Sequence, residues 1–136
     1  MYSQNAAARY RNVRSHGLIA EASPTRLIQI MFEHVLSHLA TTHGSMTRIR
    51  DNRPVSDVVA KGAALGKAIG LIDQLNACLD MQRGGEIAGN LRALYLYMMQ
   101  RLTLANATND AQIVVEVVGL VQDIKAGWDQ IVTDAR

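Results

Sequence analysis

Apolar residues recur at helical spacing along residues 86–106, and this row limits the fold more than any other feature of the chain. Its members follow at intervals of four, three, four, four and three: Ile87, Leu91, Leu94, Met98, Leu102 and Ala105. This is the period of an α-helix with one buried face, and no proline interrupts it. Gly84 and Gly85 stand directly before the row, and glycine adopts positive φ without a Cβ clash. We therefore expect a chain reversal at the two glycines, followed by one long helix.

Three further stretches repeat the helical period. The first begins at Ser23 and Pro24, which suit the N-cap and first-turn positions of a helix, and runs to about residue 50. The rows of the three stretches are Ile28, Met31, Val35, Leu39, Met46 and Ile49; Val58, Leu65, Ile69, Ile72 and Leu79; and Ile113, Val117, Leu120, Ile124, Trp128 and Ile131. The last stretch is apolar on more than one side, because Val114, Val118, Val121 and Val132 lie outside its row.

Short turns separate these stretches. Turn residues occupy 51–54 and 106–110, and Asn109 with Gln112 three positions later has the form of a capping pair. Four long helices joined by short turns favour an all-α fold, an antiparallel up-down four-helix bundle. We assign residues 23–136 to this single domain and residues 1–22 to an N-terminal arm or short extra helix.

The composition agrees with a folded helical domain. Hydrophobic residues make up 49% of the chain and aromatic residues only 4%, so the core is expected to be aliphatic. The net charge of +2 is too small to indicate a nucleic-acid partner. The single cysteine, Cys78, is expected to be a small buried core thiol. Residues 1–20 lack the apolar region of a secretory signal, and the apolar runs are too short for a membrane span. We therefore expect a cytosolic protein with no stable membrane insertion.

The arm leaves several interpretations open. Tyr2, Ala6, Tyr10 and Val13 recur at spacings of four, four and three, which fits a short amphipathic helix. A frayed terminus is equally compatible with the sequence. Three arginines give the arm positive charge, but no stacking motif of a nucleic-acid-binding segment accompanies them.

Three glycines form a line along the second helix. Gly62, Gly66 and Gly70 recur every four residues, and glycine within a helix costs about 0.8–1 kcal/mol relative to alanine. Such a line needs a reason. One is the close approach of a neighbouring helix of the same chain, and the other is a shallow groove in which a partner lies.

The sequence contains one arrangement that could hold a metal. His34 and His38 are one helical turn apart and Glu33 adjoins them. However, no HExxH motif occurs, and no histidine lies on the later helices. Solvated or half-buried histidines are the simpler interpretation, and a metal-binding bundle using these residues is kept as the alternative. No phosphate loop or activated nucleophile is recognisable. We therefore expect neither a cofactor nor an enzymatic activity.

Much of the chain resembles a known family. The segments Gly84-Gly85-Glu86-Ile87-Ala88, Asn90-Leu91, Leu94-Tyr95, Tyr97-Met98, Arg101-Leu102 and Ala105-Asn106 are similar to the central signature of the FliS family of bacterial flagellar export chaperones. Tyr2, Tyr10 and Ala22-Ser23-Pro24 match the family's N-terminal layout, and the resemblance covers roughly residues 2–132. Phe32 and Glu33 replace the family's usual Tyr and Asp, and His34 stands where the family tends to have Gly.

This resemblance implies a function. It implies a flagellin-specific export chaperone that binds the disordered C-terminal segment of flagellin and prevents premature polymerisation. It also implies delivery of the complex to the export gate protein FlhA, and an arm that covers the client site. The candidate partner-binding residues are the two arm tyrosines, the glycine line with its neighbours, and the apolar side of the final helix: Tyr2, Tyr10, Gly62, Leu65, Gly66, Ile69, Gly70, Val117, Leu120, Val121, Ile124 and Trp128.

Overall fold

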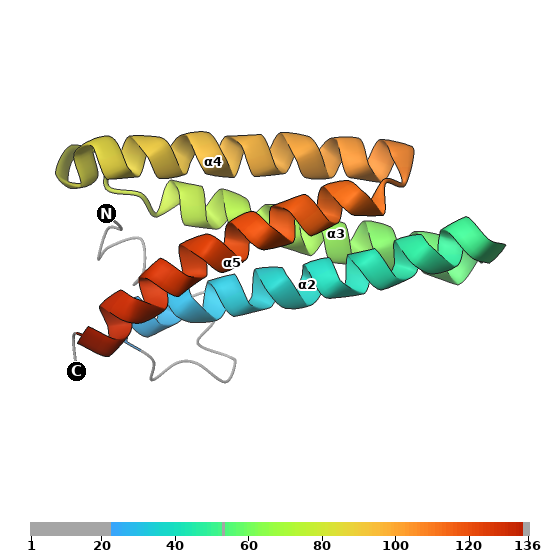
Figure 1. The fold of residues 1–136 in the computed structure, drawn as a ribbon, viewed down its shortest axis with the longest axis horizontal. Helices are drawn as coiled ribbons and strands as arrows, with labels where there is room; N and C mark the ends of the chain where they lie inside the picture. Colours follow the sequence, from blue (N-terminus) through green and yellow to red (C-terminus); the bar gives the residue numbers. More distant parts are fainter. Residues whose placement is uncertain (1–22, 53, 135–136) are drawn as a thin grey trace.

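Four antiparallel α-helices make up the computed structural model, which describes residues 23–52 and 54–134. They are α2 (Pro24–Asn52), α3 (Val55–Ala77), α4 (Met81–Thr108) and α5 (Ala111–Asp134). Successive helices run in opposite directions along the long axis of the molecule (Figure 1). Each helix packs against its neighbours in sequence, and α2 also packs against α5, which closes the bundle. The predicted up-down four-helix bundle is confirmed. Tyr2 and Tyr10 lie outside the described residues, as does the rest of the predicted arm.

Helix α2 supplies much of the core. Ser23 caps it as predicted: its side-chain Oγ accepts the backbone N–H of Arg26 at 3.2 Å, and Pro24 occupies the first turn. Its fully buried apolar side chains, all at most 1% exposed, are Leu27, Ile28, Met31, Phe32, Val35, Leu39 and Met46. Because α2 packs against both α3 and α5, apolar residues on two of its sides are covered.

The chain reverses between α3 and α4 earlier than predicted. α3 ends at Ala77, and Asp80 caps α4 by accepting the backbone N–H of Arg83 at 3.0 Å. Gly85 does adopt positive φ (φ 53°, ψ −129°), but it does so one helical turn inside α4. The glycine therefore kinks the start of α4, whereas Asp80 marks the corner.

The turn between α4 and α5 also differs from the prediction. Asn109 ends α4 in the left-handed conformation, with φ 52°. Asp110, not Asn109, caps α5, because its carboxylate accepts the backbone N–H of Gln112 at 3.0 Å. Asn109 is needed at the preceding position because asparagine tolerates positive φ better than most residues.

Most residues of the predicted rows are buried or half-buried, and the largely exposed exceptions lie toward helix ends. Cys78 is buried, as predicted. Ile87, Val58 and Ile131 are 63%, 47% and 48% exposed although each lies in a predicted core row. Helical period identifies the face of a helix, but a neighbour must extend far enough to cover it. No helix among the described residues is long and apolar enough to cross a membrane.

Candidate functional site

The glycine line lies on the outer face of α3. Gly62, Gly66 and Gly70 are exposed, and a Cβ added at any of them would meet nothing within 4 Å. Of the two interpretations of this line, close packing of a neighbouring helix is therefore not found among the described residues. Val55 and Val59 continue the line at helical spacing and are 78% and 66% exposed. We call these five residues the α3 outer face; it is smooth, uncharged and about 22 Å long at 1.5 Å per residue.

The two other candidate residues of α3 are less accessible. Leu65 is 2% exposed and belongs to the core, while Ile69 is half-buried and packs against the core. A partner lying on the α3 outer face would reach Leu65 only if the helices moved apart.

The candidate residues of α5 also divide into buried and partly exposed ones. Val117, Val121 and Trp128 are at most 8% exposed. The indole N–H of Trp128 donates to the carbonyl of Thr25 at 2.9 Å, which fixes the end of α5 to the start of α2. Leu120 and Ile124 remain partly exposed, so these two are the α5 candidates that a partner can touch without rearrangement.

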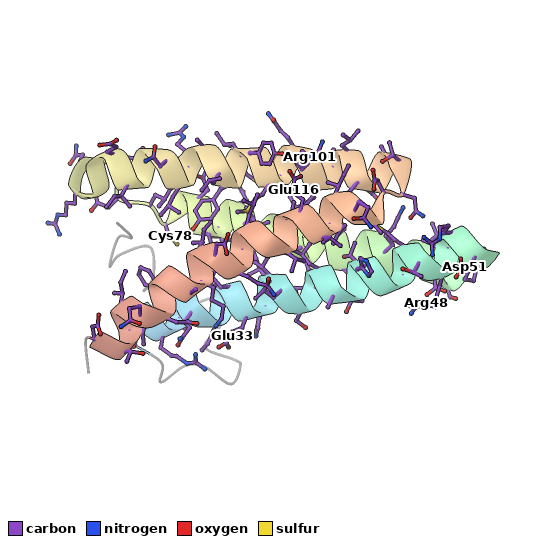
Figure 2. All side chains as sticks on the ribbon, in the orientation of Figure 1. Glu33, Arg48, Asp51, Cys78, Arg101 and Glu116 are labelled. Carbon is purple, nitrogen blue, oxygen red and sulfur yellow. The ribbon has the colours of Figure 1, made fainter. Side chains whose placement is uncertain are left out.

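A polar tie joins α4 to α5 near their common turn. The Tyr97 hydroxyl donates to Glu116 Oε2 at 2.7 Å, and Arg101 Nε donates to Glu116 Oε1 at 2.9 Å. The Tyr97 hydroxyl first, and Arg101 next, lower the pKa of the Glu116 carboxyl below its usual range. Figure 2 shows Arg101 and Glu116 between the two helices. Away from this tie, α5 runs away from α4 toward its C-terminal end (Figure 1).

Apolar residues extend along both helices beyond the tie. On α4, Leu94 and Leu91 are partly exposed and Ile87 is largely exposed. Leu94 lies three residues before Tyr97, and Leu120 lies four residues after Glu116, so each row shares a face with the tie. We define the α4–α5 face as Ile87, Leu91, Leu94, Leu120, Ile124 and Ile131. It is incompletely covered in the part of the chain that the structure describes.

Sequence reasoning missed the outer side of α4. Leu96 and Leu104 are 42% and 44% exposed and lie outside the predicted row. The available signal was their position: both are large aliphatic residues off the core stripe of an amphipathic helix. Apolar residues in such positions add to the surface that a partner could bury.

The metal alternative finds no support in the geometry. Glu33 accepts a hydrogen bond from Arg26 at 3.1 Å, and the rings of His34 and His38 stand edge to face with centroids 6.5 Å apart. Within residues 23–52 and 54–134, no group of three or more His, Cys, Asp or Glu side chains is arranged to hold a metal ion. The features that stand out are therefore apolar surfaces suited to binding a polypeptide.

Comparisons with known proteins give a consistent result. Residues 4–135 match the family model described as flagellar protein FliS. The flagellar secretion chaperone FliSB of Pseudomonas aeruginosa is 41% identical over 131 residues, covering 96% of this chain and 98% of that protein. The flagellar secretion chaperone FliS of Salmonella typhimurium is 43% identical over 132 residues, covering 96% and 93%. The protein of the same name from Vibrio cholerae is 36% identical over 122 residues, covering 90% and 85%.

Proposed function

This chain belongs to the FliS family of flagellar proteins, and from that membership we propose that it is a flagellin-specific export chaperone. At the coarser level it is a flagellar secretion chaperone and not an enzyme. The client in this proposal is the disordered C-terminal segment of flagellin. The chaperone acts in the cytosol, without a cofactor.

The observation that carries the proposal is the exposed apolar surface outside the core. The α3 outer face and the α4–α5 face together present valine, leucine and isoleucine side chains that the helices of the described residues leave exposed or cover only in part. An amphipathic client helix gains stability by placing its own apolar face on such a surface. The client then orders as it binds, and the chaperone helices are preformed.

Binding in this way explains both parts of a chaperone's work. Covered client helices cannot pair with other flagellin molecules, so polymerisation in the cytosol is prevented. The rest of the client remains unfolded for export, and the complex is delivered to the export gate protein FlhA. In this proposal the binding energy comes from burial of apolar surface, and no nucleotide is consumed.

The N-terminal arm has a place in this proposal. An empty apolar surface favours aggregation, and a tethered segment with Tyr2 and Tyr10 on one side would cover it at high effective concentration. Deletion of residues 2–17 should then raise the client on-rate and promote self-association of the free chaperone. Unchanged light scattering and an unchanged on-rate would exclude this role for the arm.

Isothermal titration calorimetry with truncated flagellin tests the client assignment. Flagellin without its C-terminal helices should not bind, whereas flagellin without its N-terminal helices should bind one-to-one. Equal binding of the two truncations would refute the assignment.

A matched pair of variants tests the surface. Val59→Glu places a charge on the α3 outer face and should weaken client binding at least about tenfold. Val115→Glu places the same charge on α5, at a position that is 49% exposed and outside both faces, and should bind like the wild type. Similar losses for both variants would mean that the α3 outer face has no special role.

A further inference from the structure

A hollow of about 530 Å³ opens at the end of the bundle where α2 ends and α3 begins. Its walls come from Ile49 and Arg50 of α2, Val58 and Lys61 of α3, and the last turn of α4 at residues 106–109. Figure 2 labels Arg48 and Asp51 at this end of the molecule. The hollow is separate from the α4–α5 face, and none of the contacts described above accounts for it.

Lys61 is a buried cation that lines this hollow. It is 9% exposed, and its ammonium group donates to the carbonyl of Asn106 at 3.2 Å and to Asn109 Oδ1 at 3.4 Å. Both partners are neutral oxygens, and no carboxylate of the described residues forms a salt bridge with Lys61. An ammonium has three donors, so one N–H remains beyond these two bonds. Buried charges are normally paired, which makes an unpaired one informative.

Arg50 adds a second positive charge to the wall. Its only ion pair in the described residues is with Asp51 at 3.4 Å, and both side chains are well exposed, so the pair holds Arg50 weakly. Among the described residues that line the hollow, none is acidic. The C-terminal end of α4 contributes a partial negative charge, about half an elementary charge, which is less than the two cations supply.

The remaining wall is aliphatic. Ile49, Val58 and Ala107 line the hollow beside the two cations. A smaller hollow of about 320 Å³ on the other side of Arg50 includes Asp110, whose carboxylate disfavours an anion there. The larger hollow thus combines two positive charges with apolar contact, whereas the smaller one has a single cation, Arg50, together with the carboxylate of Asp110.

We propose that the larger hollow binds a carboxylate carried on a short aliphatic group, as at the C-terminal end of a polypeptide whose last residue is aliphatic. Lys61 supplies the buried charge, and the planar guanidinium of Arg50 closes on the carboxylate with paired hydrogen bonds. Val58 and Ile49 contact the aliphatic group. This inference does not depend on the client assignment, because the hollow and the two apolar faces are built from different residues.

Nuclear magnetic resonance titration of the full chain at low ionic strength tests the proposal. N-acetyl-leucine carries the carboxylate and the aliphatic group, N-acetyl-leucinamide lacks only the charge, and inorganic phosphate lacks the aliphatic group. We expect N-acetyl-leucine to shift the backbone amide signals of Val58, Lys61 and Asn109 in a saturable way, and the other two probes to bind at least fivefold more weakly. Equal binding of N-acetyl-leucinamide would show that charge has no part in it. Equal binding of phosphate would show a general anion patch. Either result overturns the assignment.

Variants identify the residues. Arg50→Gln should weaken N-acetyl-leucine binding at least about fivefold, since it removes a charge-assisted contact. Arg48→Gln is the matched control: Arg48 lies on the same helix, is exposed and pairs with Asp57, but does not line the hollow, so binding should not change. Lys61→Met should abolish binding. If Lys61→Met fails to fold, Arg50→Gln decides, and wild-type affinity in that variant refutes the proposal.

Discussion

Helices α2 and α4 have almost the same length, 29 and 28 residues, yet they bury their apolar side chains very differently. α2 packs along α3 and α5, and its large core residues are at most 8% exposed. α4 also has two neighbours, but Ile87, Leu96, Tyr97 and Leu104 on it are 40–63% exposed. Equal length and equal periodicity therefore do not produce equal burial.

The difference separates two uses of apolar residues. In α2 they stabilise the fold, because side chains on two sides of the helix are buried and so removed from water. In α4 about half of them line the core, and the others face outward, where they contribute little to stability and are available to a partner. The comparison predicts that changes in α2 affect folding and changes on the outside of α4 or α3 affect binding.

The strongest test compares two leucines. Leu39→Ala in α2 removes a fully buried side chain and should lower the free energy of unfolding by about 2–5 kcal/mol, because it leaves a cavity. Leu104→Ala in α4 removes a side chain that is 44% exposed and should cost less than about 1 kcal/mol. Urea unfolding measures both. A loss from Leu104→Ala as large as that from Leu39→Ala would contradict this difference between α2 and α4, since the outer row of α4 would then contribute to folding as a core does.

Replacing either of two glycines in α4 by alanine should give the next largest change in stability. α2 continues through Gly44, whereas α4 is kinked at Gly85, whose φ of 53° and ψ of −129° are unfavourable for any side chain. Gly85→Ala should therefore destabilise the protein by about 1–3 kcal/mol. Gly89→Ala, one turn later in the helix and with nothing within 4 Å of the new Cβ, should stabilise it by about 0.5–1 kcal/mol.

If the two variants change the stability in opposite directions, the kink at Gly85 arises from the backbone conformation that only glycine adopts easily. A Gly85→Ala variant as stable as the wild type would mean that α4 can begin as a straight helix. Thermal unfolding of both variants beside the wild type gives the answer.

The positions of the helices could be predicted from the sequence, but which of their residues are buried could not. The rows of apolar residues and the Ser23-Pro24 start predicted the bundle, because these signals are local. The predicted row of α4 includes Ile87, which is exposed, and does not include Tyr95, which is 1% exposed. Burial depends on how far a neighbouring helix extends and at what angle, and periodicity carries neither.

The candidate site was predictable to a similar degree. The glycine line was identified from its spacing, but the choice between a packed and an open line required the structure. Leu65, Val117 and Val121 are among the predicted partner contacts but lie in the core, because an excess of apolar residues on a helix does not say which of them face outward. The exposed Leu96 and Leu104 were missed for the same reason. The partner roles of the predicted residues remain predictions.

Gly66→Leu tests whether the α3 outer face is open and binds the client. A Cβ at this position meets nothing within 4 Å, so stability should hold or rise by up to about 1 kcal/mol through helix propensity. If the α3 outer face binds the client, the affinity should fall at least about fivefold. Gly127→Leu on α5, also exposed and without close neighbours, is the control and should leave affinity unchanged. Calorimetry and thermal unfolding on the same samples separate the two effects. Reduced stability in Gly66→Leu would contradict an open α3 outer face.

The smallest predicted effect is a pH dependence that arises at α2. Burial, then the positive charge of Lys67 on α3, and then His34 on the same helix lower the pKa of His38 below its ordinary value of about 6.5. The unfolded chain therefore binds a proton at His38 more readily than the folded chain does. The contribution to stability is complete above pH 6.5 and is lost as the pH falls through the lowered pKa of the folded state.

Urea midpoints between pH 8 and pH 5 measure this dependence. The wild type should become less stable toward pH 5, and His38→Gln should flatten the decline because glutamine does not titrate. Lys67→Gln removes one of the causes and should flatten it in part. α4 has no histidine, so replacing its exposed Leu104 by Ala should leave the pH profile unchanged in shape. If the stability of His38→Gln fell as steeply toward pH 5 as that of the wild type, the pH sensitivity would arise at another residue. Packing of α2 against α3 would then not depend on a neutral His38.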